Sequence, residues 1–117
     1  MRKPVVIEYW CDDQESIESW VPEDTSDFDF YLNMMICCDQ HAGDNFTVHV
    51  VSPNNIEPGS EAKKYLIVLS VYSWESLKNE IDSILEKCAN ISWFGMQEEL
   101  SKHFHWEYEG MVPPYKT

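Results

Sequence analysis

Cysteine and histidine are the residues of this chain best suited to metal chemistry. Cys37-Cys38-x-x-His41 offers three ligands that zinc accepts, and His103 and His105 add two imidazoles further along the chain. A structural zinc site usually draws two ligand pairs at recognisable spacing, and the second pair is missing here. We therefore expect no metal and no cofactor, and we expect the four cysteines to be buried or inert thiols (Cys11, Cys37, Cys38 and Cys88).

Paired carboxylates are a second candidate for chemistry. Glu107 and Glu109 would share one face of a strand, about 7 Å apart, a spacing that suits glycoside hydrolysis. A solvated strand face explains the same pattern. The acidic stretch does not match a calcium-binding EF-hand, because glycine is absent from the sixth place of its candidate loops. Since the chain also lacks a glycine-rich phosphate loop and a G-x-S-x-G turn, we expect no catalytic residues and no enzyme.

Negative charge is concentrated in the first half of the chain. The formal net charge is -13, and residues 4–62 hold thirteen carboxylates with no Lys or Arg. Eight of these acids lie in residues 12–29, which we name the acidic segment. Such a surface excludes nucleic acid and anionic membrane as direct ligands, because both bind through Lys and Arg. Solubility alone explains acidity in many proteins, but a stretch without bases favours a strongly basic partner.

Strand patterns fill the region around and after the acidic segment. Residues 5–10 are β-branched and aromatic, and residues 28–36 alternate between apolar and other side chains with a period of two, which predicts a strand with one dry face. Residues 46–51 alternate in the same way after a turn cluster. Residues 65–72 form a nearly continuous apolar run, which predicts a central strand, and the short polar connections suggest antiparallel neighbours.

Helical patterns follow the strands. Ser73 is a predicted N-cap, and an apolar stripe at helical spacing begins at Trp74 and runs to Cys88. A second helix is predicted from Ser92, and residues 105–109 alternate once more. The order predicts one α+β domain over residues 1–117, with an antiparallel β-sheet of about four to five strands and two C-terminal helices packed on one face.

No targeting segment is apparent in the sequence. The apolar run near the N-terminus stops after three residues, which is too short for a signal peptide, and no stretch approaches the roughly 20 apolar residues of a membrane span. We therefore expect a cytoplasmic protein.

Five segments, taken in order, resemble the immunity protein 8 family of bacterial polymorphic toxin and contact-dependent growth inhibition systems. They are Trp20-Val21-Pro22-Glu23-Asp24 before a Phe-led strand, Phe46-Thr47-Val48-His49-Val50-Val51-Ser52-Pro53, Tyr65-Leu66-Ile67-Val68, Tyr72-Ser73-Trp74, and His105-Trp106-Glu107-Tyr108-Glu109. The family resemblance leads us to expect a glycine-containing turn after the second strand, and Cys37-Cys38-Asp39-Gln40 departs from it. The resemblance implies a cytosolic inhibitor that binds a cognate toxin domain.

Charge and resemblance together predict an immunity protein that neutralises a cognate basic toxin, of nuclease type, and protects the producing cell. The expected partner-binding residues are the acids and aromatic anchors Asp12, Asp13, Glu15, Glu18, Trp20, Glu23, Asp24, Asp27, Asp29, Glu107, Tyr108 and Glu109. Two alternatives stay open: an acidic adaptor or nucleic-acid mimic without a toxin partner, and an enzyme whose site carries no known motif. The sequence does not set the oligomeric state.

Overall fold

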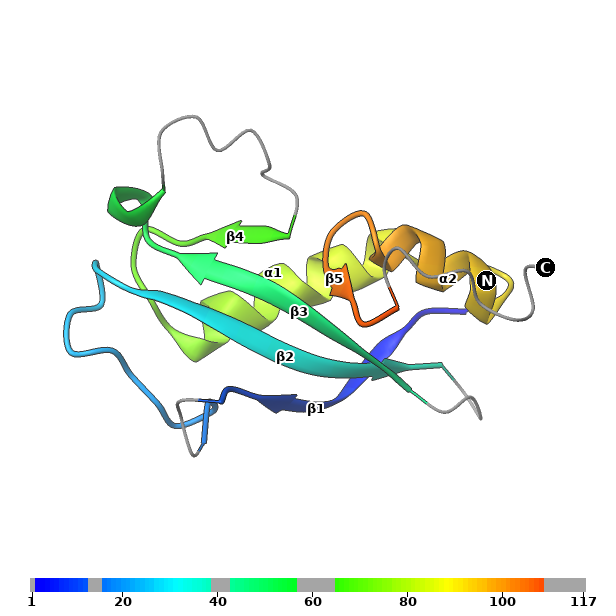
Figure 1. Ribbon diagram of the computed structural model, residues 1–117, viewed down its shortest axis with the longest axis horizontal. Coiled ribbons are helices and arrows are strands. Elements are labelled where there is room, and N and C mark those ends of the chain that lie inside the picture. The colour runs from blue at the N-terminus through cyan, green and yellow to red at the C-terminus, as the bar shows by residue number, and fades with distance from the viewer. Residues whose placement is uncertain (1, 13–15, 39–42, 57–64, 109–117) are drawn as a thin grey trace.

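Three long strands precede the helices, and two short strands complete the sheet. The computed structural model describes residues 2–12, 16–38, 43–56 and 65–108 of the 117. Within these ranges the order is β1 (Val5–Trp10), β2 (Asp29–Cys37), β3 (Asp44–Val51), a 3-10 turn η1 (Pro53–Asn55), β4 (Leu66–Val68), α1 (Trp74–Lys87), α2 (Trp93–Leu100) and β5 (His105–Trp106) (Figure 1). The predicted α+β class is confirmed.

The sheet consists of an antiparallel meander of three strands, followed by one parallel and one antiparallel strand that both pair with β3. β1 pairs antiparallel with β2, and β2 pairs antiparallel with β3 from Asp29 opposite Val51 to Ile36 opposite Asp44. The other edge of β3 is shared by two strands from later in the chain. β4 runs parallel beside residues 49–51, and β5 runs antiparallel beside residues 46–47.

The expectation of an antiparallel central strand over residues 65–72 is wrong. Only Leu66–Val68 pairs with β3, and it does so as a parallel strand at the end of the sheet order. A parallel neighbour requires a connection of a dozen or more residues, and the 14 residues from 52 to 65 are enough for that return. Beyond β4 the chain leaves the sheet, and the Tyr72 N–H donates to the Thr25 carbonyl at 2.7 Å.

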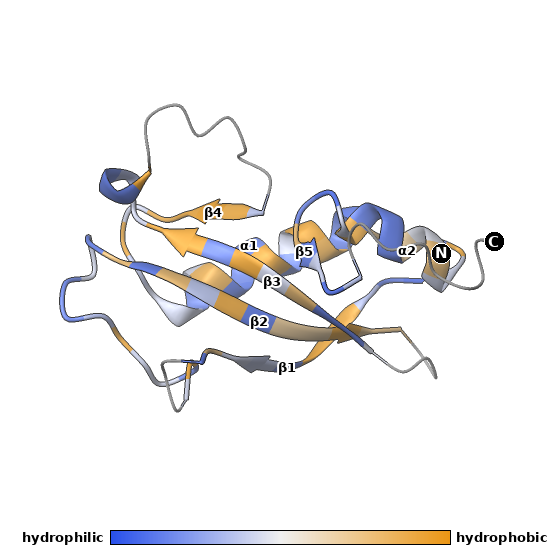
Figure 2. Cartoon of the chain, viewed as in Figure 1, coloured by the Kyte–Doolittle hydropathy of each residue, from blue (hydrophilic) through white to orange (hydrophobic). Residues whose placement is uncertain are grey.

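The core lies between one face of the sheet and α1. The dry face predicted for the second strand is confirmed, because alternate side chains of β2 and β3 are at most 7% exposed: Phe30, Leu32, Met34, Ile36, Phe46, Val48 and Val50. The buried stripe of α1 packs against them through Leu77, Ile81 and Leu85. Figure 2 shows apolar positions alternating along both strands and recurring along α1. Burial of this apolar surface is the main force that stabilises the fold.

Both helices begin where the sequence predicts. Ser73 Oγ accepts a hydrogen bond from the Ser76 N–H at 3.0 Å, and Ser92 Oγ accepts one from the Gly95 N–H at 3.0 Å. These caps satisfy amide groups that the first turn of a helix leaves without partners. Among the described helices, none has both the length and the apolar character needed to cross a membrane.

All four cysteines are buried thiols, in keeping with their expected structural role. Burial raises the pKa of Cys88 to about 11, so this thiol stays protonated and unreactive at neutral pH. His41, the third member of the zinc pattern, lies outside the described residues. Across the described part of the chain, no group of three or more His, Cys, Asp or Glu side chains is arranged to hold a metal ion.

Candidate functional site

Within the described part of the chain, both helices lie on the same side of the sheet, and neither covers its other face (Figure 1). We name it the open face, and it carries the side chains of β2 and β3 that alternate with the core positions. The register places Tyr31 opposite His49 and Asn33 opposite Thr47 on this face. Tyr31 is 61% exposed, which is unusual for so large a ring in the middle of a sheet. The open face is therefore a candidate interaction surface.

Cross-strand contacts hold the side chains of the open face in place. The rings of Tyr31 and His49 stack with centroids 4.4 Å apart and planes 14° from parallel. The Nε2 atom of His49 is hydrogen-bonded to Oδ1 of Asp29, and Thr47 Oγ1 donates to Asn33 Oδ1 at 2.8 Å. Contacts of this kind restrict the rotamers of an exposed surface before any partner arrives.

A pocket of about 330 Å³ opens beside these residues, and we name it the Asp29 pocket. Asp29, Tyr31 and His49 form its polar and aromatic wall. The rest of the lining, which we call the rim, consists of Val51, Asn55, Ile56 and Leu66. Its described lining includes a carboxylate and an imidazole but neither Lys nor Arg. The pocket therefore combines a flat aromatic surface with a negative charge.

The acidic segment runs from the end of β1 to the start of β2 (Figure 1), and its last residue, Asp29, lines this pocket. All of its described carboxylates are exposed: Asp12, Glu18, Glu23, Asp24, Asp27 and Asp29. Asp13 and Glu15 fall outside the described residues. The segment thus presents its charges to solvent.

Hydrogen bonds fix two of the exposed carboxylates. Asp24 accepts from both the backbone N–H and the hydroxyl of Ser26, at 2.9 and 2.7 Å, and these bonds lower the pKa of its carboxyl group. Asp27 accepts from the side-chain amides of Asn54 and Asn55, at 3.0 Å each. Donors of this kind stabilise the charged form of Asp24.

Trp20, one of the expected partner-binding residues, contributes in part to the core. Its ring is half-buried and meets Phe30 and Tyr72 edge-on, with centroid separations of 5.0 and 5.3 Å. Aromatic contacts of this geometry stabilise a core. Trp20 therefore attaches the acidic segment to the fold, and only part of its ring is left for a partner.

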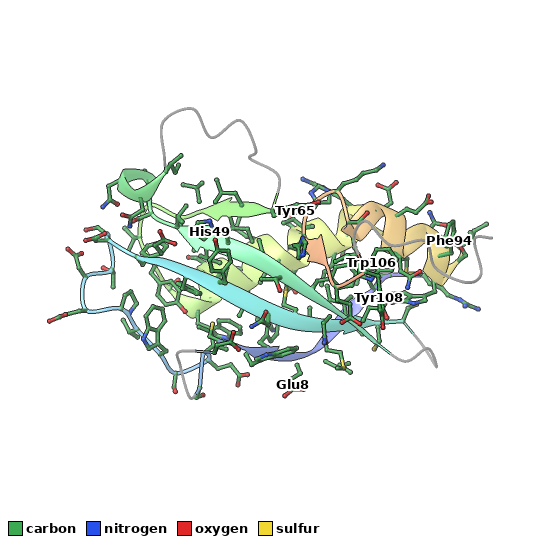
Figure 3. All side chains as sticks on the ribbon, in the orientation of Figure 1. Glu8, His49, Tyr65, Phe94, Trp106 and Tyr108 are labelled. Carbon is green, nitrogen blue, oxygen red and sulfur yellow. The ribbon has the colours of Figure 1, made fainter. Side chains whose placement is uncertain are left out.

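Glu107 and Asp29, one from each predicted group of partner-binding residues, lie at opposite ends of β3. Glu107 accepts a hydrogen bond from the Asn45 N–H at 2.7 Å, at the first end of β3, whereas Asp29 pairs with Val51 at the other end. Six residues of strand separate these ends by roughly 20 Å. Tyr108 is 42% exposed and packs edge-on against Trp106 near α2, as Figure 3 shows.

The expected strand face of Glu107 and Glu109 is also corrected. β5 contains only His105 and Trp106, and Glu107 and Tyr108 follow in a turn. The Glu107 side chain raises the pKa of Tyr108 by hydrogen bonding to its hydroxyl. Glu109 lies outside the described residues.

Sequence reasoning missed Tyr31 and His49 as candidate site residues. Both occupy positions that alternate with the dry face, so the period of two could have assigned them to the open face. Their stacking was not predictable from either strand alone, because 18 positions separate them and only the register of β2 and β3 brings the rings together.

These features define a small α+β protein with an open sheet face and an acidic loop, in which the described residues show no metal centre. The chain belongs to the immunity protein 8 family, whose model matches residues 6–111. No curated protein and no solved structure matches the chain. Membership identifies it as an immunity protein, a class whose partners are cognate toxins.

Proposed function

We propose that this protein binds and neutralises a basic toxin domain of nuclease type in the cytoplasm of the producing cell, and that it does so without catalysis. The observation that carries the proposal is the run of thirteen carboxylates, unopposed by Lys or Arg, across residues 4–62. A nuclease must neutralise the phosphates of its substrate with basic side chains. An acidic inhibitor complements that same surface and blocks access to it.

The acidic segment is the proposed contact surface for the toxin. Exposed charges mainly accelerate association, because they steer two proteins of opposite charge toward each other. Salt screens this attraction beyond about 8 Å at physiological ionic strength. The association rate should therefore fall steeply as salt is added, while the dissociation rate changes less.

Surface plasmon resonance against the toxin domain recovered by pull-down from the producing strain tests the proposal. Reversal of Asp24 and Asp27 to Lys should slow association at low salt and reduce protection of cells that express the toxin. A matched control reverses Glu80 and Asp82 on α1 to Lys, which changes the net charge by the same amount on exposed positions outside the acidic segment. Salt-independent association, together with full protection by the Asp24→Lys/Asp27→Lys variant, would reject the acidic segment as the interface.

A further inference from the structure

The Asp29 pocket points to a more specific contact, which rests on the proposed function. We propose that this pocket receives one arginine side chain of the toxin, with the guanidinium group against Tyr31 and in a charge-assisted hydrogen bond with Asp29. The acidic segment would increase the association rate, and this contact would slow dissociation of the complex once it has formed.

Charge complementarity identifies the occupant as a cation. The carboxylate of Asp29 belongs to the pocket wall and its side chain is 49% exposed, so it can still be reached from solvent. His49 contacts one of the two carboxylate oxygens, and a carboxylate can accept further hydrogen bonds. Asp27 and Asp24 add negative charge in the adjoining segment.

The shape of the wall favours arginine over lysine. One face of the Tyr31 ring is stacked on His49, which fixes the ring, and the residue is still 61% exposed, so the remaining ring surface is open to an incoming group. A guanidinium group is planar, stacks on aromatic rings and donates to a carboxylate in a fork, whereas an ammonium group is a compact and strongly hydrated point charge. The apolar rim residues Ile56 and Leu66 suit the methylene stem of the same side chain.

The pocket is held in shape before binding. Asn55, on its rim, donates from Nδ2 to the Phe28 carbonyl at 2.9 Å, to Asp27 Oδ1 at 3.0 Å and to Ser52 Oγ at 3.1 Å. Ser52 is fully buried, so this network connects η1 to the entrance of β2 inside the fold. A preformed site loses less entropy on binding, which favours a slow dissociation rate.

The dissociation rate of the toxin complex is the first test. Asp29→Asn and Tyr31→Leu should each speed dissociation at least tenfold, whereas Tyr31→Phe, which keeps the ring, should stay close to wild type. Glu8→Gln is the matched control, because it removes the same charge from an exposed β1 residue that lies outside the pocket (Figure 3). Unchanged thermal melting of each variant shows that the fold is retained.

A titration with N-acetyl-arginine amide, followed by NMR of the whole chain, examines the pocket without the toxin. We expect saturable shifts of the Tyr31 and His49 ring signals that are lost in Asp29→Asn, and weaker shifts with N-acetyl-lysine amide. Equal shifts with both probes, or none with arginine, would overturn the arginine site.

The two proposals fail in different ways. If the wild-type chain binds the toxin tightly and Asp29→Asn and Tyr31→Leu dissociate like wild type, the arginine site is refuted and the proposed function stands. If the wild-type chain does not bind the toxin, the proposed function is refuted, and the NMR titration alone decides whether the pocket takes a guanidinium group.

Discussion

Ser52→Ala should destabilise the fold although it removes a single oxygen atom. Ser52 is 0% exposed and its hydroxyl lies among several polar groups. Oγ accepts from the Phe28 N–H at 3.0 Å and from the Asn55 side chain at 3.1 Å, and it lies 2.5 Å from Asn54 Oδ1, to which it can donate. The Phe28 residue is itself buried, so loss of Oγ leaves its amide without this acceptor in the interior.

The magnitude follows from that buried amide. Leaving a buried donor without a partner costs about 1–3 kcal/mol, whereas the average net value of a hydrogen bond is nearer 1 kcal/mol. For a domain of this size each kcal/mol lowers Tm by roughly 4 °C, so Tm should fall by roughly 4 to 12 °C. Truncation of Ser83, an exposed α1 residue, should change stability by less than about 0.5 kcal/mol.

Urea unfolding followed by tryptophan fluorescence measures this difference. The midpoint for Ser52→Ala should move to lower urea with an unchanged slope, because the mutation alters stability rather than the surface exposed on unfolding. Amide hydrogen exchange should also accelerate at Phe28. If the free energy of unfolding of Ser52→Ala falls by less than about 0.5 kcal/mol, the hydrogen bonds of Ser52 do not stabilise the start of β2.

Two further predictions concern the helices and their surroundings. Ile81→Ala should lower the free energy of unfolding by about 2–5 kcal/mol, because the side chain is 0% exposed beneath the sheet; a loss under 0.5 kcal/mol in chemical denaturation would show that α1 is peripheral. Burial, and then the nearby charge of Lys87, lower the pKa of His103 below its usual value near 6.5. The unfolded chain therefore takes up this proton first as the pH falls, so stability should drop below about pH 6.5. His103→Gln should lessen that drop in unfolding curves at pH 7 and pH 5, and an equal drop would contradict the assignment.

Local patterns were sufficient to predict most of the fold. The alternation from Phe28 to Ile36 predicted both a strand and its buried face, and Ser73 predicted the start of α1. The pairing of β4 had no local signal, because Leu66–Val68 reads equally well as a parallel or an antiparallel strand. Its direction depends on the route of the chain after β3, which short-range preferences do not determine.

For the candidate site, too, some features could be predicted from the sequence and others could not. The excess of carboxylates is a property of composition, so the acidic segment could be found from the sequence alone. The Asp29 pocket depends on register, since it forms only where Tyr31 lies opposite His49. The contact of Trp20 with Tyr72 had no local signal, because the two residues are far apart in the sequence.

The shared edge of β3 has a consequence during synthesis on the ribosome. Both strands that close this edge are made after β3, and β5 emerges 55 residues later than Val51. At 5–20 residues per second, that interval lasts roughly 3–11 s, during which the part of the β3 edge that β5 covers stays unpaired. Neighbouring nascent chains could pair through such an edge. Because thirteen carboxylates and no bases occupy residues 4–62, two such chains repel each other until the later segments arrive.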